Sequence, residues 1–168
     1  MKRSILLWQI GGITFSAMLG TILHFLFDWT NITFLSTISA VNESTWEHMK
    51  LLFFPTFIFA IIEWFFFKEE YKDFWWIKFI GIVIGLLSIP TLFYTFNGAI
   101  GKTPDWFNIL IFFISLVLSY FIEYLLFKNE KILKKQNFIP FTLLCLICVL
   151  FIVFTFYPPC LPIFISPV

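Results

Sequence analysis

The sequence predicts an all-α membrane protein, a polytopic bundle of five transmembrane helices in one domain of residues 1–168. Three observations lead to this prediction. Hydrophobic residues make up 60% of the chain and charged residues only 12%, whereas a soluble domain carries about 25% charged residues. Aromatic residues are abundant, with 26 phenylalanines and 7 tryptophans. Five apolar stretches are close to the ~20 residues that a helix needs to cross the hydrocarbon of a bilayer.

The predicted spans, in order, are Ile5–Phe27, Met49–Phe67, Phe74–Phe96, Trp106–Phe127 and Phe138–Tyr157. Lys2 and Arg3 precede the first span as they would a secretory signal. Its apolar run has no cleavage site, however, so we interpret it as a retained helix. The third span contains Lys78 one turn from its start, where a lysine is expected to extend its ammonium group to the lipid headgroups. Two prolines, Pro158 and Pro159, end the fifth span.

The basic residues are strongly biased to one side of the predicted bundle. Nine lie on one side: Lys2, Arg3, Lys68, Lys72, Lys78, Lys128, Lys131, Lys134 and Lys135. The other side has only Lys50 and Lys102. Cytoplasmic loops of membrane proteins are enriched in lysine and arginine. The bias therefore predicts a cytoplasmic N-terminus, an extracytoplasmic C-terminus and an extracytoplasmic loop over residues 28–48.

An internal similarity appears at an offset of 60 residues, where "IEWFFFKEE" (62–70) matches "IEYLLFKNE" (122–130). It favours a duplicated two-helix hairpin, with spans two and three as one unit and spans four and five as the other. The match superposes two intramembrane carboxylates, Glu63 and Glu123. Facing each other, they would suit proton or cation handling in a small transporter. Alternatively, both lie at the lipid edge and reach toward the cytoplasm.

The predicted topology gathers polar residues at the extracytoplasmic boundary. His24 and Asp28 are spaced i,i+4, so they are expected to share a helix face and pair. Other residues of this group precede the second span or end the third. The group predicts a ligand pocket whose candidate residues are His24, Asp28, Asn42, Glu43, Glu47, His48, Tyr94 and Asn97. Histidine titrates near neutral pH, so the proton-transfer candidates are His24, His48 and Glu47.

The segment Val41–Lys50, "VNESTWEHMK", also has a structural interpretation. Ser44 and Glu47 have the S-x-x-E spacing of a capping box directly before an apolar run. Trp46 would then serve as an aromatic anchor at the membrane interface. Capping and anchoring assign no role to three residues: Asn42, Glu43 and His48.

Metal and redox chemistry have weaker support. His24 and His48 with a carboxylate such as Glu47 would make a three-ligand site of the zinc type, but no compact H-x-x-x-H or H-E-x-x-H motif is present. The sequence does not identify a cofactor. Cys145 and Cys148 form C-x-x-C within the fifth span, which is compatible with thiol chemistry. Buried cysteines more commonly behave as small hydrophobic residues.

Three stretches carry a resemblance: "GTILHFLFDWT", "NESTWEHMKLLFFP" and the C-terminal "FTFYPPCLPIFISPV". With the string N-E-S-x-W-E-H-x-K, they resemble a family of small bacterial integral membrane proteins known only as a domain of unknown function. The resemblance implies a multi-pass protein of the bacterial plasma membrane and supplies no activity. The tail departs from the family pattern, which has histidine and aspartate at Cys160 and Ser166. The tail of this chain therefore supplies no third histidine to a site.

The sequence favours a membrane protein with an extracytoplasmic polar pocket that binds or processes a lipid-like or small amphiphilic ligand. One alternative is a non-enzymatic subunit that docks a partner membrane protein or forms a homo-oligomer. The other is a small transporter that uses Glu63 and Glu123. A net charge of +1 supplies no basic surface and argues against a nucleic-acid partner. The motifs assign no enzyme class.

Overall fold

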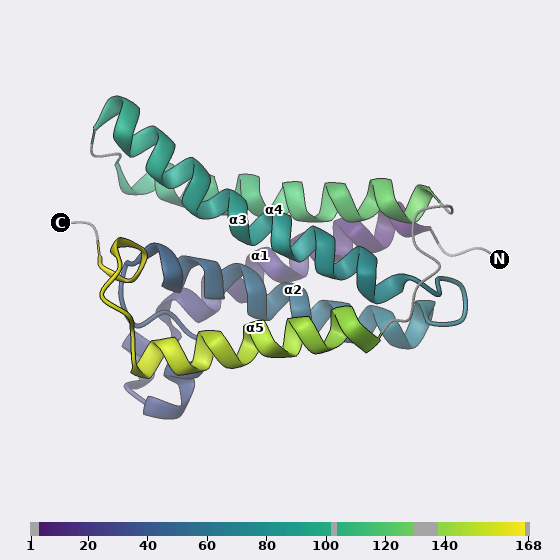
Figure 1. Cartoon of the computed structure of the whole chain (residues 1–168), viewed down its shortest axis with the longest axis horizontal. Coiled ribbons are helices and arrows are strands. Elements are labelled where there is room, and N and C mark those ends of the chain that lie inside the picture. Colours follow the sequence, from purple (N-terminus) through teal and green to yellow (C-terminus); the bar gives the residue numbers. More distant parts are fainter. Residues whose placement is uncertain (1–3, 102–103, 130–137, 167–168) are drawn as a thin grey trace.

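The computed structural model describes residues 4–101, 104–129 and 138–166, which form a bundle of five long α-helices (Figure 1). They are α1 (Ile5–Thr30), α2 (Thr45–Phe67), α3 (Phe74–Ile100), α4 (Asp105–Lys128) and α5 (Phe138–Phe156). Two short 3-10 helices, η1 (Thr33–Thr37) and η2 (Pro162–Phe164), follow α1 and α5. All five long helices have the length and apolar composition needed to cross a membrane. The all-α class and the five membrane-capable helices are thus confirmed for the described residues.

Consecutive helices run in opposite directions, so the bundle has two distinct ends (Figure 1). At one end α1, α3 and α5 finish while α2 and α4 begin. We call it the histidine end, because His24 near the finish of α1 and His48 in the first turn of α2 lie there. The start of α1 and the finish of α5 lie at opposite ends, as five crossings require. Which end faces the cytoplasm stays a prediction from the basic residues.

Helix α2 is the centre of the bundle. It packs against each of the other four long helices. In its span 67% of residues are buried, against 33% or less in the other spans. Leu52, Phe53 and Ala60 are wholly inaccessible. A helix that is apolar on all sides suits this position, since no face of it must contact water. The position of α2 therefore determines which residues of the surrounding helices meet.

Helices α1 to α4 are all longer than predicted, and α2 and α3 are extended the most. α2 begins at Thr45 rather than Met49, because Ser44 caps it and accepts a hydrogen bond from the Glu47 amide at 3.3 Å. The predicted capping spacing therefore does begin this helix. α3 continues to Ile100, four residues beyond the predicted end, and finishes at Gly101, whose φ of +91° suits glycine. The extension of α2 places Glu47 and His48 on the helix.

Gly12 on α1 has no side chain, so aromatic rings from α2 and α4 contact the backbone of α1 at this residue. A Cβ atom added at Gly12 would lie 2.8 Å from Cε1 of Phe59 on α2 and would also overlap the ring of Tyr120 on α4. The adjacent Gly11 has its nearest such neighbour at 4.0 Å, again on Phe59. Small residues are the usual points of close approach between membrane helices. Gly12 therefore determines how closely α1 approaches α2 and α4.

Gly12→Ala is expected to lower the free energy of unfolding by about 1–3 kcal/mol, because the added methyl group overpacks the contact. Gly11→Ala is the matched control, since it adds the same group next door where there is room. The measurement is an SDS titration of the protein in mixed micelles, followed by circular dichroism. Equal midpoints for the two variants would contradict this packing.

Candidate functional site

Two histidines and one carboxylate meet at the histidine end. Oε2 of Glu43 lies 3.5 Å from Nε2 of His48, and Oε1 of Glu43 lies 3.9 Å from Nε2 of His24. The two imidazole centroids are 5.7 Å apart. One potential ligand atom from each of the three residues lies within 4.8 Å of the other two. We call His24, Glu43 and His48 the His–Glu site.

The cap of α2 orients His48. Its Nδ1 lies 3.0 Å from the carbonyl oxygen of Ser44, which is the N-cap residue. In the tautomer whose Nδ1–H donates to this carbonyl, Nε2 carries a free lone pair. Nε2 is also the nitrogen that faces Glu43. The cap thus presents His48 as a base or a metal ligand toward the carboxylate.

The loop that follows η1 is bonded to the turn of α1 that carries His24. Oγ of Ser39 accepts a hydrogen bond from the Phe27 amide at 3.0 Å and donates to the Leu23 carbonyl at 2.5 Å. The Ala40 amide also donates to the Leu23 carbonyl, at 3.3 Å. Three residues later the same loop supplies Glu43, so this bonding ties the two sides of the site together.

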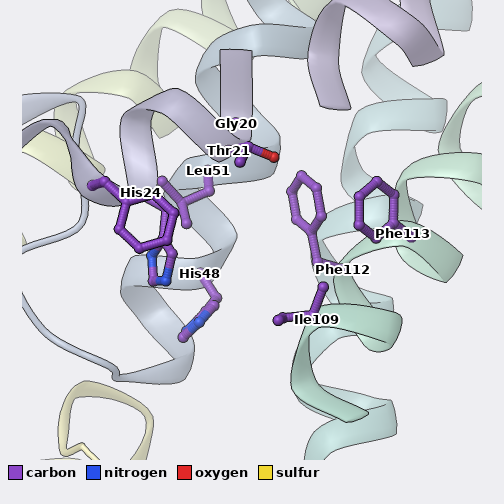
Figure 2. Close-up of a pocket in the computed structure, with 9 residues that line it drawn as sticks. Gly20, Thr21, His24, His48, Leu51, Ile109, Phe112 and Phe113 are labelled. Atoms are coloured by element: carbon purple, nitrogen blue, oxygen red, sulfur yellow. The ribbon is translucent and has the colours of Figure 1, made fainter. Parts of the chain in front are cut away.

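A pocket of about 120 Å³ lies beside the His–Glu site, between α1, α2 and α4 (Figure 2). Its wall is mostly apolar and consists of Gly20, Thr21, His24, Phe25, His48, Leu51, Ile109, Phe112 and Phe113. A Cβ atom at Gly20 would lie 2.9 Å from both the Leu51 carbonyl oxygen and Cζ of Phe112, so glycine is needed there. A mostly apolar cavity with a few polar groups gathered at one place is typical of a ligand-binding site.

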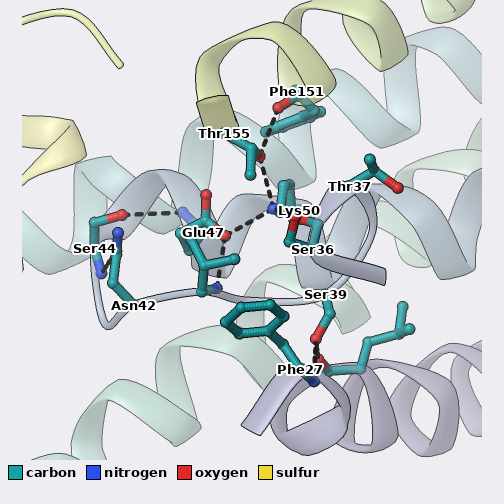
Figure 3. A network of polar contacts seen from close by, with 12 residues as sticks. Phe27, Ser36, Thr37, Ser39, Asn42, Ser44, Glu47, Lys50, Phe151 and Thr155 are labelled. Carbon is teal, nitrogen blue, oxygen red and sulfur yellow. Dashed lines mark hydrogen bonds and ion pairs between the residues drawn. The ribbon is translucent and has the colours of Figure 1, made fainter. Parts of the chain in front are cut away.

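Glu47 lies outside the His–Glu site, in a separate network around Lys50 (Figure 3). Its carboxylate lies 2.7 Å from Nζ of Lys50. The same Nζ donates to the Ser36 carbonyl and to Oγ1 of Thr155, each at 2.8 Å. Three acceptors satisfy the three ammonium hydrogens. This explains why Lys50, which the sequence analysis placed among the outer basic residues, is completely buried.

Both Glu43 and Glu47 were predicted as pocket residues, with Glu47 as the candidate for proton transfer and metal binding, but it is Glu43 that lies beside the two histidines. Glu47 points back along the loop, where it accepts a hydrogen bond from the Val41 amide at 3.0 Å. Asn42 also belongs to the cap, because its Oδ1 accepts a bond from the Ser44 amide at 2.8 Å. The capping interpretation of the segment therefore covers Asn42 and Glu47. Glu43 and His48 are left for the site.

The other three predicted pocket residues lie apart from the His–Glu site. Asp28 is exposed and forms no ion pair with His24, although the structure describes both. The expected i,i+4 pair is therefore wrong, since the loop brings Glu43 to His24 instead. Tyr94 and Asn97 lie on α3, which contributes no residue to the pocket wall. Near this end α3 leans away from α2 and α5 (Figure 1).

A second charged cluster lies inside the bundle near its opposite end. Nζ of Lys78 on α3 pairs with the carboxylates of Glu63 on α2 and Glu123 on α4, the latter at 2.5 Å. All three side chains are at most 1% exposed. The expectation that Lys78 extends to the lipid headgroups is therefore wrong. Two carboxylates from neighbouring helices neutralise the ammonium group inside the bundle, which removes its need for the headgroups.

Further polar contacts support Glu123 in this cluster. With its amide nitrogen toward α4, Gln9 of α1 donates to Oε2 of Glu123 at 3.1 Å and to the Tyr120 carbonyl at 3.2 Å. A Cβ atom at Gly81 of α3 would overlap the Glu123 side chain, so glycine makes room for it. The lipid-edge interpretation of the two carboxylates is wrong, because both are buried. Their use in transport stays a prediction, and Lys78 lies between them.

The cysteines of the C-x-x-C motif are free thiols. Cys145 and Cys148 on α5 are half-buried and pack against the hydrophobic core, and Cys160 is exposed. This packing fits the expectation that the pair behaves as small hydrophobic residues.

The sequence predicted neither the network around Lys50, nor the cluster around Lys78, nor the apolar wall of the pocket. A signal for the first was present: Glu47 and Lys50 are spaced i,i+3, a spacing at which helical side chains meet. Lys78 carried a weaker signal, since a lysine within a span usually has a partner. No local pattern distinguishes Phe112 from the many other phenylalanines, because its role depends on packing between α1 and α4.

The bundle and its buried ion pairs define a class of small helical protein with five helices able to cross a membrane. Within that class, residues 2–168 match the model of a family of unknown function, DUF6512, and the chain belongs to this family. The resemblance to a family of unknown function is thereby confirmed. Searches of curated proteins and of solved structures returned no match.

Proposed function

We propose that this protein binds a single-chain amphiphile at the histidine end of its bundle. The headgroup would contact His24, Glu43 and His48, and the first part of the hydrocarbon chain would occupy the adjoining apolar pocket. The observation that carries this proposal is the junction of polar and apolar surfaces. Two imidazoles form part of the wall of a pocket whose remaining side chains are mostly hydrophobic.

The pocket wall includes exposed apolar residues, which supports entry from the bilayer. Ile109 on α4 is 58% exposed, and Phe25 on α1 and Phe113 on α4 are also exposed. On a helix that crosses a membrane such apolar positions face hydrocarbon. A ligand that reaches the pocket between α1 and α4 would therefore keep its chain in an apolar environment throughout.

The bias of basic residues supports placing the pocket in the outer leaflet. Cytoplasmic loops collect lysine and arginine, and the predicted excess lies at the end opposite the histidines. Two of the lysines counted for this bias are buried within the bundle: Lys78 on the predicted cytoplasmic side and Lys50 on the other side. The excess of basic residues on the cytoplasmic side remains when both are left out. The proposed orientation thus depends on the terminal and loop residues alone.

The proposal is tested with the protein in lipid nanodiscs and a lysophosphatidylglycerol that carries a photoreactive diazirine in its acyl chain. We expect cross-links in the peptides that contain Gly20–Phe25 and Ile109–Phe113. Ile109→Trp, which fills the pocket mouth, should reduce this labelling severalfold. Leu110→Trp is the matched control, because Leu110 is an exposed neighbour outside the pocket wall.

The headgroup contacts predict a second effect. His48→Ala should reduce labelling of the pocket peptides while the variant still reaches the membrane at normal levels, since His48 is a partly exposed residue at a helix end. Labelling spread evenly over all five helices, and unchanged by Ile109→Trp and His48→Ala, would rule out the pocket.

A further inference from the structure

We propose that His24, Glu43 and His48 bind a divalent transition-metal ion of the Zn²⁺ class, which holds the headgroup of the amphiphile. This inference deepens the proposed function and rests on the same pocket. Imidazole nitrogens and carboxylate oxygens are zinc ligands, and two histidines with one glutamate form the protein ligand set of some catalytic zinc sites. The described residues bring this set together from α1, α2 and the loop between them.

The spacing of the donors suits such an ion. Bonds of about 2.0–2.1 Å in a tetrahedron separate the ligand atoms by about 3.3 Å. Oε2 of Glu43 lies 3.5 Å from Nε2 of His48, and Oε1 lies 3.9 Å from Nε2 of His24. One donor atom from each of the three residues lies within 4.8 Å of the other two, so these donors are farther apart than those of a loaded site. The Glu43 side chain is 65% exposed and belongs to the loop before α2. Changes in the side-chain torsions of Glu43 and of the two histidines can bring the three donors closer together.

The environment of His48 is that of a metal ligand. Histidines that bind metals almost always donate their second ring N–H to a carbonyl or carboxylate, which fixes the tautomer and the ring orientation. Here Nδ1 of His48 lies 3.0 Å from the Ser44 carbonyl, while Nε2 faces Glu43. The outer-shell contact of one ligand is therefore already in place.

His24 supplies an independent observation. Its Nδ1 is buried and has no hydrogen-bond partner among the described residues. Its Nε2 lies 3.9 Å from Glu43, beyond hydrogen-bond distance. Buried polar groups in folded proteins are normally paired. Neither ring nitrogen of His24 therefore has a hydrogen-bond partner among the described residues, which leaves the imidazole available to a ligand outside the chain.

Three protein ligands leave a coordination position for an oxygen atom, the arrangement of catalytic rather than structural zinc sites. A divalent ion bound by one carboxylate and two neutral imidazoles carries a net positive charge. It would therefore favour an anionic headgroup, such as a phosphate or carboxylate, over a cationic amine. The apolar pocket next to it accepts the chain, so the inferred ligand class is an anionic single-chain amphiphile.

The test uses the full-length protein in detergent, stripped with a chelator and titrated with ZnCl2 by calorimetry. Metal content is then measured by mass spectrometry after gel filtration. We expect one Zn²⁺ per chain. Glu43→Gln should weaken binding by more than about 10-fold, the lower limit typical for loss of a mere outer-shell partner. His48→Ala should reduce the retained metal to background, whereas Asp28→Asn, a nearby exposed carboxylate, should bind as the wild type does.

Co²⁺ provides a second readout that a structural role of these residues would not affect. Its visible ligand-field absorption should report tetrahedral coordination in the wild type and disappear in Glu43→Gln. This variant changes an exposed loop side chain, so it decides the question even if His48→Ala fails to fold. Folded wild-type protein without bound zinc, or equal affinity in wild type and Glu43→Gln, would overturn the metal site.

Photolabelling of the same samples separates the two proposals. Pocket labelling by the diazirine lipid in protein that binds no zinc would retain the amphiphile pocket and overturn the metal site alone. Stoichiometric zinc that depends on Glu43, without any pocket labelling, would retain the metal site and overturn the amphiphile.

Discussion

Lys78→Met is expected to destabilise the protein by about 3–5 kcal/mol, the range for breaking a buried ion pair by removal of one partner. Methionine has a similar length but no charge, so the carboxylates of Glu63 and Glu123 would be left facing each other inside the bundle. Two unpaired carboxylates in a dry interior must become protonated or draw in water, and either costs free energy. The measurement is the SDS-induced unfolding midpoint in mixed micelles.

Lys68→Met provides the control, because Lys68 is an exposed lysine at the end of α2. It should shift stability by no more than about 0.5 kcal/mol. A triple variant, Glu63→Gln, Lys78→Met and Glu123→Gln, should recover part of the loss, since uncharged residues of similar volume often replace a buried ionic cluster without penalty. A Lys78→Met protein as stable as Lys68→Met would contradict the buried cluster.

Lys50→Met is expected to have a comparable effect at the other end, again about 3–5 kcal/mol. This ammonium group joins three elements: it pairs with Glu47 on α2 and donates to Ser36 of η1 and Thr155 of α5. Its loss would leave Glu47 buried without its counter-charge and would release the loop from α5. Thermal unfolding monitored by circular dichroism would detect the change.

Two variants divide this effect into its parts. Thr155→Val removes the hydrogen bond that Thr155 accepts from Lys50 and the one that it donates to the Phe151 carbonyl. It should cost about 1–3 kcal/mol, because a buried ammonium hydrogen loses its acceptor. Glu47→Gln combined with Lys50→Met removes both charges and should be more stable than Lys50→Met alone. If the double variant were no more stable than the single one, the unpaired Glu47 carboxylate could not be the source of the loss.

The number, order and approximate limits of the five helices could be predicted from the sequence. Membrane spans are local features: each needs only enough consecutive apolar residues to match the hydrocarbon thickness. The start of α2 had a local signal as well, since Ser44 and Glu47 have capping spacing. The predicted limits missed the first turn of α2 because polar residues were excluded from the span. Those residues nevertheless form helix, and they include Glu47 and His48.

The candidate site was predictable only in part. The pattern pointed to both histidines and to the polar segment before α2, and the structure places His24 and His48 side by side. It could not distinguish Glu43 from Glu47, four residues apart on either side of the helix start. The choice depends on where helix geometry begins and on Lys50, which binds Glu47 and leaves Glu43 to the histidines.

The sequence by itself therefore determined that the protein suits a lipid bilayer and where its helices lie along the chain. It also determined the end of the bundle at which the two histidines lie. Those properties follow from the hydropathy and the length of each segment, which depend only on residues that are neighbours in the chain. Only the tertiary structure decided which charges meet. Partners such as Lys78 with Glu63 and Glu123 lie on three different helices. Their contact depends on the rotation and crossing of those helices, which arise from packing of the whole bundle and leave no mark in any single segment.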